Sequence, residues 1–211
     1  MGNHKYHHGD LKNTLIETGL KVITEEGIAK LSIRYVANKI GVSHAAPYRH
    51  FKNKEGFTVA IALNGFWILQ KELNEALKEK ADDPEAQLIC LAKAFIRFAV
   101  SHPDYYRVMY RDYIRNKTDY PELFQNFDVL FRQRVELIEE CRRRRDTCDG
   151  KVSAKSGTKE KKATIDAQIT AIAISSLLHG YASMIIDNEK DAHVGSEGQI
   201  QLITQKILDL I

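Results

Sequence analysis

Apolar residues recur at intervals of three and four along almost the whole chain of 211 residues. This spacing places them on one face of an α-helix, whereas a half-buried β-strand would alternate apolar and polar residues. The sequence shows no such alternation and no glycine-rich phosphate loop. It therefore predicts an all-α fold. The predicted helices begin near residues 10, 32, 44, 54, 84, 103, 121, 163 and 197.

The stretch from residue 31 to residue 57 has the pattern of a helix-turn-helix followed by the start of a long third helix. Ser32 is a candidate N-cap of the first short helix, and Gly41 ends it. Ser43 then follows as a second N-cap, so the next helix is expected from residue 44 to about residue 50. Pro47 lies in its first turn and lacks an amide hydrogen, so we expect a tightened or kinked turn there.

The outward residues of this second helix are small, polar or basic, as suits a helix that enters the major groove of DNA. The start of the long helix offers backbone amides that favour phosphate. The stretch therefore predicts a DNA-binding surface, although two packed helices without a partner would show the same spacing. The candidate DNA contacts are Ser32, Arg34, Ser43, His44, Ala45, Tyr48, Arg49, His50, Lys52 and Lys54.

The distribution of charge supports this prediction. The formal net charge is +3, and residues 1–56 contain nine Lys and Arg against five Asp and Glu, so the remainder carries −1. A local basic region is typical of a nucleic-acid surface rather than of a generally basic protein. A polar arm with three histidines, residues 3–9, precedes the first helix, and we expect it to lie against phosphates rather than to bind a metal.

The residues of this stretch resemble the DNA-binding domain of the tetracycline-repressor (TetR) family. The pattern S-x-R-x-V-A-x-x-x-G-V-S begins at Ser32, and Y-x-H-F-x-x-K-E-x-F begins at Tyr48. The order SHAAPYRHF also resembles a subgroup with a W-x-x-x-H-G motif near its C-terminus, where this chain has Ser175, His179 and Gly180. The resemblance implies a transcriptional repressor that binds operator DNA as a homodimer and is released by a small molecule.

We expect two domains, a DNA-binding domain of residues 1–56 and an effector-binding and dimerisation domain of residues 57–211. Residues 145–162 are rich in charge, glycine and serine, and so predict a mobile connection. The two most C-terminal helices are apolar enough to pair with those of a second copy in a two-fold dimer. Such a dimer presents two identical DNA-binding surfaces, so we expect the operator to be double-stranded and palindromic. Candidate effector contacts, chosen mainly on the resemblance, are Phe66, Phe95, Tyr106, Phe127, Phe131 and His179.

Two other classes of function stay open from the residues alone. An all-helical enzyme would need placed nucleophiles or acid-base pairs, and Cys90, His102 with Asp104, and His179 are candidates, but they form no recognised catalytic pattern. A DNA-binding protein without an effector is the second alternative. The three cysteines lack metal or disulfide spacing, so we expect no metal site and no cofactor. The N-terminus is polar and no apolar run approaches about 18 residues, so we expect a cytoplasmic, non-membrane protein. Without a catalytic pattern, we expect that it is not an enzyme.

Overall fold

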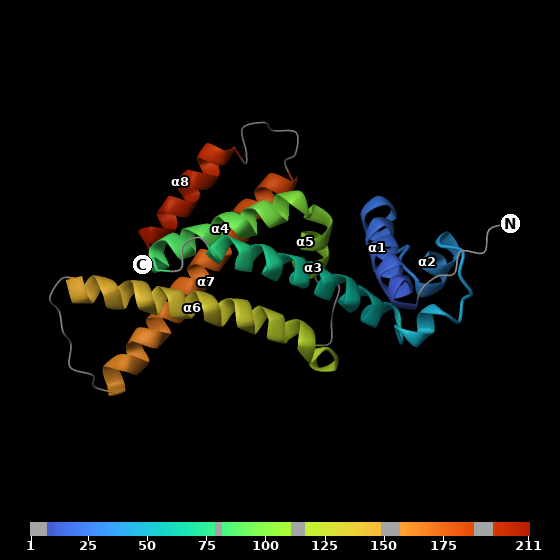
Figure 1. Cartoon of the computed structure of the whole chain (residues 1–211), viewed down its shortest axis with the longest axis horizontal. Helices are drawn as coiled ribbons and strands as arrows, with labels where there is room; N and C mark the ends of the chain where they lie inside the picture. Colours follow the sequence, from blue (N-terminus) through green and yellow to red (C-terminus); the bar gives the residue numbers. More distant parts are fainter. Residues whose placement is uncertain (1–7, 79–81, 111–116, 149–156, 188–195) are drawn as a thin grey trace. The chain divides into compact units, whose positions relative to one another are not determined.

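The computed structural model of the chain describes residues 8–78, 82–110, 117–148, 157–187 and 196–211 (Figure 1). Every regular element in these ranges is helical, which confirms the predicted all-α fold. The elements are α1 (His8–Glu26), α2 (Ile33–Lys39), the 3-10 turn η1 (Pro47–Arg49), α3 (Lys54–Leu77), α4 (Pro84–Ser101), α5 (Pro103–Tyr110), the 3-10 turn η3 (Lys117–Asp119), α6 (Pro121–Cys148), α7 (Gly157–Asp187) and α8 (Glu197–Leu208).

The chain forms two compact units. Unit 1 contains residues up to 68 and residues 102–124, and unit 2 contains residues 69–101 and 125–211. The predicted DNA-binding domain of residues 1–56 therefore lies within a larger unit that also includes the start of α3 and all of α5. The predicted arm falls mostly on residues 1–7, which lie outside the described residues.

The core of unit 1 is built on Phe57, whose side chain is fully buried. The ring of Phe51 lies 4.6 Å from that of Phe57 between centroids. A Cβ atom at Gly19 would come within 2.6 Å of the Phe57 ring, so α1 can pack this closely on α3 only because residue 19 has no side chain. Gly27 and Gly41 follow α1 and α2 with φ of 85° and 70°, a left-handed conformation that favours glycine.

Unit 2 is organised around α4, which packs against both α7 and α8 (Figure 1). Helix α4 starts where the sequence predicts, at Pro84. The Asp83 side chain caps it by accepting hydrogen bonds from the amides of Glu85 and Ala86. The buried residues that fill the space between these helices include Leu88, Leu91, Ile96, Phe98, Ile138, Ile174 and Ile207.

The connection predicted for residues 145–162 is too long at both ends, because the flanking helices extend into it. Helix α6 continues to Cys148, and α7 begins at Gly157; residues 149–156 lie outside the described residues. The arginine run stays helical because the Glu140 carboxylate forms ion pairs with Arg143 and Arg144, one turn further along the helix. Arg145 forms an ion pair with Glu85 at 2.7 Å. Ion pairs three and four residues apart stabilise a helix that apolar periodicity would not reveal.

By length and composition alone, the segment Ala163–Asp187 of α7 is apolar enough to cross a membrane, with a mean hydropathy of 1.6. One such helix is weak evidence, since the core helix of a soluble protein meets the same criteria. Here 44% of the apolar window is buried inside the protein, where α7 packs on α4. The composition of α7 is therefore explained by packing within unit 2 and by one exposed apolar face, described below.

Candidate functional site

The prediction of a regular helix over residues 44–50 is wrong. The segment consists of turns followed by the 3-10 turn η1. Pro47 has no amide hydrogen to give to the carbonyl of Ser43, so the amide of Ala46 donates to that carbonyl instead, at 3.1 Å. His50 then donates to the Pro47 carbonyl at 2.9 Å. The tightened turn that Pro47 predicts is present, and it extends over the whole segment.

This recognition segment, residues 43–50, has a buried side and an exposed side. Pro47 is buried, and η1 packs against α1 and α2. Tyr48 is 47% exposed, and Arg49 and His50 are also exposed. All ten candidate DNA contacts are exposed. These are Ser32, Arg34, Ser43, His44, Ala45, Tyr48, Arg49, His50, Lys52 and Lys54.

Ser32 and His44 also have contacts within the protein. The Ser32 hydroxyl caps α2 by accepting the amide hydrogen of Tyr35 at 3.1 Å, as the sequence predicts. The Nε2 atom of His44 lies 2.5 Å from Oδ1 of Asn38, so a side chain of the recognition segment is hydrogen bonded to α2. The bond from His44 therefore ties the recognition segment to α2 without DNA.

A polar cluster between α1 and α2 was not predicted. The Tyr35 hydroxyl donates to Glu26 at 2.7 Å, and Lys39 pairs with the same carboxylate at 2.7 Å. Hydrogen bonds from Lys39 and Tyr35 hold the pKa of Glu26 below its ordinary value. Tyr35 and Lys39 lie one turn apart on α2, but Glu26 is the last residue of α1, so helical periodicity alone could not have joined the three. The cluster ties the C-terminal end of α1 to α2.

Lys54, a predicted phosphate contact, has an internal role in the structure. Its Nζ atom donates to the carbonyl of Ile28 at 2.7 Å and lies 3.5 Å from the carbonyl of Ala29. These carbonyls belong to the loop between α1 and α2, so the side chain ties that loop to the first turn of α3. An ammonium group carries three donors, which leaves one for a phosphate.

The matched variants Lys54→Met and Lys52→Met separate the two roles. Each removes one exposed positive charge, but only Lys54→Met also removes the bond to the loop carbonyl. We expect both to weaken DNA binding and reduce its salt dependence, and only Lys54→Met to lower the Tm, by about 3 °C. Thermal unfolding and salt-dependent fluorescence anisotropy measure these effects. Equal Tm values for the two variants would contradict the internal role.

Unit 2 contains a cavity of about 440 Å³ between α6 and α7, which we call the effector cavity because predicted effector contacts line it. The Arg142 guanidinium joins the same two helices by donating to the Thr170 hydroxyl at 2.9 Å and pairing with Asp166 at 3.0 Å. The wall combines two phenylalanines and one isoleucine with an arginine, an aspartate, a histidine and two serines. The lining residues are Phe127, Asp128, Phe131, Arg134, Ile172, Ser175, Ser176 and His179.

The structure brings together four of the six predicted effector contacts. Phe127, Phe131 and His179 line the effector cavity, and the ring of Phe95 packs edge-on against His179 with centroids 4.8 Å apart. Phe66 and Tyr106 belong to unit 1, where both are buried. Periodicity places all six residues on inward helix faces, but it does not show in which compact unit each face is buried.

Burial lowers the pKa of His179 to about 4, and the charge of Arg134 acts in the same direction. The imidazole is therefore neutral at physiological pH and offers one donor and one acceptor. Because the folded pKa lies below the unfolded value of 6.5, the unfolded chain binds the extra proton first. The contribution to stability is complete above pH 6.5 and is lost as the pH falls toward 4.

We therefore expect the free energy of unfolding to fall by about 2 kcal/mol more between pH 8 and pH 5 in the wild type than in His179→Gln. Glutamine keeps a donor and an acceptor but does not titrate. Urea unfolding at the two pH values measures the difference. If the two proteins lose the same stability, His179 is not the buried neutral group that the structure describes.

The sequence predicted that α7 and α8 both carry spare apolar surface, and the structure confirms this only for α7. The predicted stripe on α8 faces its own chain, since Ile200 and Ile207 are buried in unit 2. Helix α8 is held there by α4, where Arg97 pairs with Glu197 at 2.9 Å and Lys93 donates to Gln201. The large apolar side chains left exposed on α7 are Ile165, Ile169, Ile172, Leu177 and Met184, while Leu202 on α8 and Leu210 just beyond its end are also exposed.

Both parts of the chain match models of known protein families. Residues 15–61 match the bacterial regulatory proteins of the tetR family, and residues 88–198 match the tetracyclin repressor-like C-terminal domain. The second match alone covers more than half of the chain. The two matches correspond to the recognition region of unit 1 and to the region that contains the effector cavity.

Individual proteins are more distantly similar. The fatty acid metabolism regulator protein of Bacillus subtilis (strain 168) is 27% identical over 88 residues, 42% of this chain and 45% of that protein. The class A tetracycline repressor protein from transposon 1721 of Escherichia coli is 29% identical over 96 residues, 46% of this chain and 43% of that protein. The chain thus spans about half the length of the curated relatives it matches.

The fold is shared over nearly the full length with solved structures. The fatty acid degradation regulator FadR from Bacillus halodurans superposes with a TM-score of 0.64 at 15% identity, covering 93% of this chain and 94% of that one. At this identity the likeness concerns the fold alone. The matches to both family models show that the chain belongs to the TetR family of bacterial transcriptional regulators.

Proposed function

We propose that this protein is a homodimeric repressor that binds a palindromic operator and is released from it by a small, largely apolar molecule. The observation that carries the DNA-binding part is the exposed recognition segment within the matched region of the family. Pro47 holds the segment against α1 and α2 while Tyr48 and Arg49 stay accessible. We retain residues 1–56 as the DNA-binding domain and residues 57–211 as the regulatory domain.

The direct test is selection of bound DNA from a random duplex library. Two copies of one recognition segment, related by a two-fold axis, should select two inverted half-sites separated by about one helical turn or a multiple of it. Recovery of unrelated sequences at equal frequency would reject sequence-specific binding. A single half-site without symmetry would reject the dimeric mode while keeping DNA recognition. Operator binding would also place the protein in the bacterial cytoplasm.

The exposed apolar face of α7 supports the dimeric part of the proposal. Ile165 and Ile169 lie one turn apart and are 57% and 60% exposed. Isolated surface apolar residues are ordinary, but a stripe along one helix indicates a protein interface. In a two-fold dimer the same stripe would be covered by its counterpart, with Leu202 of α8 at the margin. Such pairing would fix the distance between two recognition segments.

The effector cavity supports the ligand part. Phe127, Phe131 and Ile172 provide apolar walls, while Arg134 and His179 offer polar atoms that could orient one end of a ligand. A mostly apolar cavity with a few polar groups is the usual form of a small-molecule site. Relatives named as regulators of fatty acid metabolism make acyl compounds the first class to test.

Phe127→Ala should weaken the effector without weakening the operator. Loss of one aromatic wall removes apolar contact with the ligand, so the concentration needed for half-release should rise by about tenfold. Operator affinity without ligand should stay within about twofold of the wild type, because Phe127 is not part of unit 1. Operator release is measured by anisotropy with a series of fatty acids and acyl thioesters.

Val129→Ala is the matched control, since Val129 is on the same helix and is exposed but does not line the cavity. Equal responses of both variants would reject this cavity as the effector site. If acyl and other apolar compounds raise the Tm yet never change DNA affinity, the cavity binds a ligand without coupling. The alternative of an effector-independent DNA-binding protein would then be favoured.

A further inference from the structure

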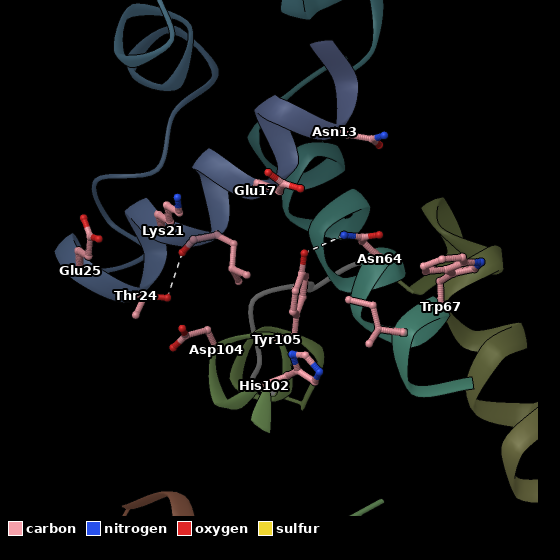
Figure 2. Close-up of a pocket in the computed structure, with 12 residues that line it drawn as sticks. Asn13, Glu17, Lys21, Thr24, Glu25, Asn64, Trp67, His102, Asp104 and Tyr105 are labelled. Atoms are coloured by element: carbon pink, nitrogen blue, oxygen red, sulfur yellow. Dashed lines mark hydrogen bonds between the residues drawn. The ribbon is translucent and has the colours of Figure 1, made fainter. Parts of the chain in front are cut away.

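Unit 1 contains a second cavity, of about 820 Å³, that shares no residue with the effector cavity. It lies where the outer face of α1 meets α3 and α5 (Figure 2). We call it the α1 cavity. Its lining residues are Asn13, Glu17, Leu20, Lys21, Thr24, Glu25, Asn64, Trp67, Ile68, His102, Asp104 and Tyr105.

The charges around the α1 cavity are mostly negative. Glu17 and Glu25 come from α1 and Asp104 from α5, against the single ammonium of Lys21. With His102 neutral, the lining carries a formal charge of −2. Asp104 also pairs with Arg107 at 3.6 Å on its own helix, which is a long ion pair. The surroundings therefore favour a cation and oppose an anion.

Aromatic side chains form the remaining wall. Trp67 is 64% exposed, the largest exposed fraction of any aromatic residue in the described parts of the chain. Tyr105 is half-buried, and its hydroxyl oxygen accepts a hydrogen bond from Asn64 at 2.7 Å, drawn in Figure 2. Burial raises the pKa of Tyr105, so the hydroxyl stays protonated and adds no charge of its own to the cavity. His102 meets the Tyr105 ring edge-on.

We propose that the α1 cavity binds a small organic cation through the carboxylates of Glu17 and Asp104 and the ring of Trp67. Indole faces attract cations, and the attraction strengthens when carboxylates lie nearby. A bare metal ion fits less well, because the described residues contain no group of three or more His, Cys, Asp or Glu placed to hold one. A neutral apolar molecule would cover the carboxylates without compensating their charge.

The α1 cavity lies on a helix that contacts the recognition segment. Helix α1 supplies half of the lining residues and also packs against α2 and η1. A bound cation would thus touch the helix that supports the recognition segment. The proposal does not depend on the effector cavity, on dimerisation or on the identity of the operator.

Trp67 is the single tryptophan of the chain, so its fluorescence reports on this cavity specifically. The probe is benzyltrimethylammonium, compared with neutral benzyl alcohol and anionic phenylacetate at constant ionic strength. We expect a saturable change in Trp67 emission with the cation and binding weaker by about tenfold or more for the other two probes. Isothermal titration calorimetry of the same probes provides a second readout.

The decisive variant is Glu17→Gln with Asp104→Asn, which removes two charges and keeps side-chain size. Its Kd for the cation should rise by about tenfold, whereas the control Glu136→Gln with Asp146→Asn, two exposed carboxylates of α6, should stay within about twofold. Circular dichroism checks that each variant is folded. Equal affinity of the variants, equal affinity for all three probes, or no signal in either readout up to about 10 mM would overturn the proposal.

Discussion

The Ile165→Asp, Ile169→Asp double variant is expected to be monomeric and to lose operator affinity by about 100-fold or more. Both side chains are mostly exposed on α7, and neither lines the effector cavity. In the proposed dimer they would be buried, and burying an unpaired carboxylate costs several kcal/mol. A monomer engages one half-site at a time, so it loses the gain in affinity that comes from linking two binding events.

Sedimentation velocity measures the oligomeric state, and anisotropy with the selected operator measures affinity. Val129→Asp is the matched control, because it puts the same charge on an exposed apolar position of α6 outside the proposed interface. It should leave both quantities unchanged. A dimeric double variant, or a monomeric one that still binds the operator tightly, would contradict pairing through α7.

The Tyr48→Ala, Arg49→Ala double variant is expected to bind the selected operator about 100-fold more weakly and to stay folded. Both side chains are exposed in η1, so their removal leaves no internal cavity. Contacts to a base or phosphate are each worth about 1–3 kcal/mol, and two of them account for the expected loss. Binding to unrelated DNA should fall less, because other basic residues still meet the backbone.

Arg132→Ala provides the comparison, since Arg132 is an exposed arginine of α6 in unit 2. It should keep full operator affinity. Measuring both variants across a range of salt concentrations separates base contacts, which change sequence preference, from phosphate contacts, which change the salt slope. Unchanged operator affinity in a folded Tyr48→Ala, Arg49→Ala protein would remove this segment from the DNA interface.

The sequence by itself determined the class of fold and the places where most helices begin. Apolar spacing of three and four residues is a local property of the chain, so it identified α1, α3, α4 and α6 without knowledge of their partners. Proline and capping chemistry are equally local, which is why Ser32 and Pro84 were correctly placed at helix starts. The same local residues carried the family resemblance.

The tertiary structure alone decided what each apolar face is packed against. The stripe through Ile200 and Ile207 looked available to a partner, but α4 of the same chain covers it. Likewise, Phe66 was grouped with Phe127, although they belong to different compact units. Periodicity shows that a face is buried and is silent about its partner, because the partner is distant in sequence.

Polar contacts between distant residues were undetermined by the sequence for the same reason. The bond from Lys54 to the loop carbonyl of Ile28 and the α1 cavity beside Trp67 join positions whose spacing follows no helical period. They exist because α1, α3 and α5 are brought together by the buried core of unit 1. Local patterns therefore fixed which helices form, and the packing of those helices decided which side chains face a ligand.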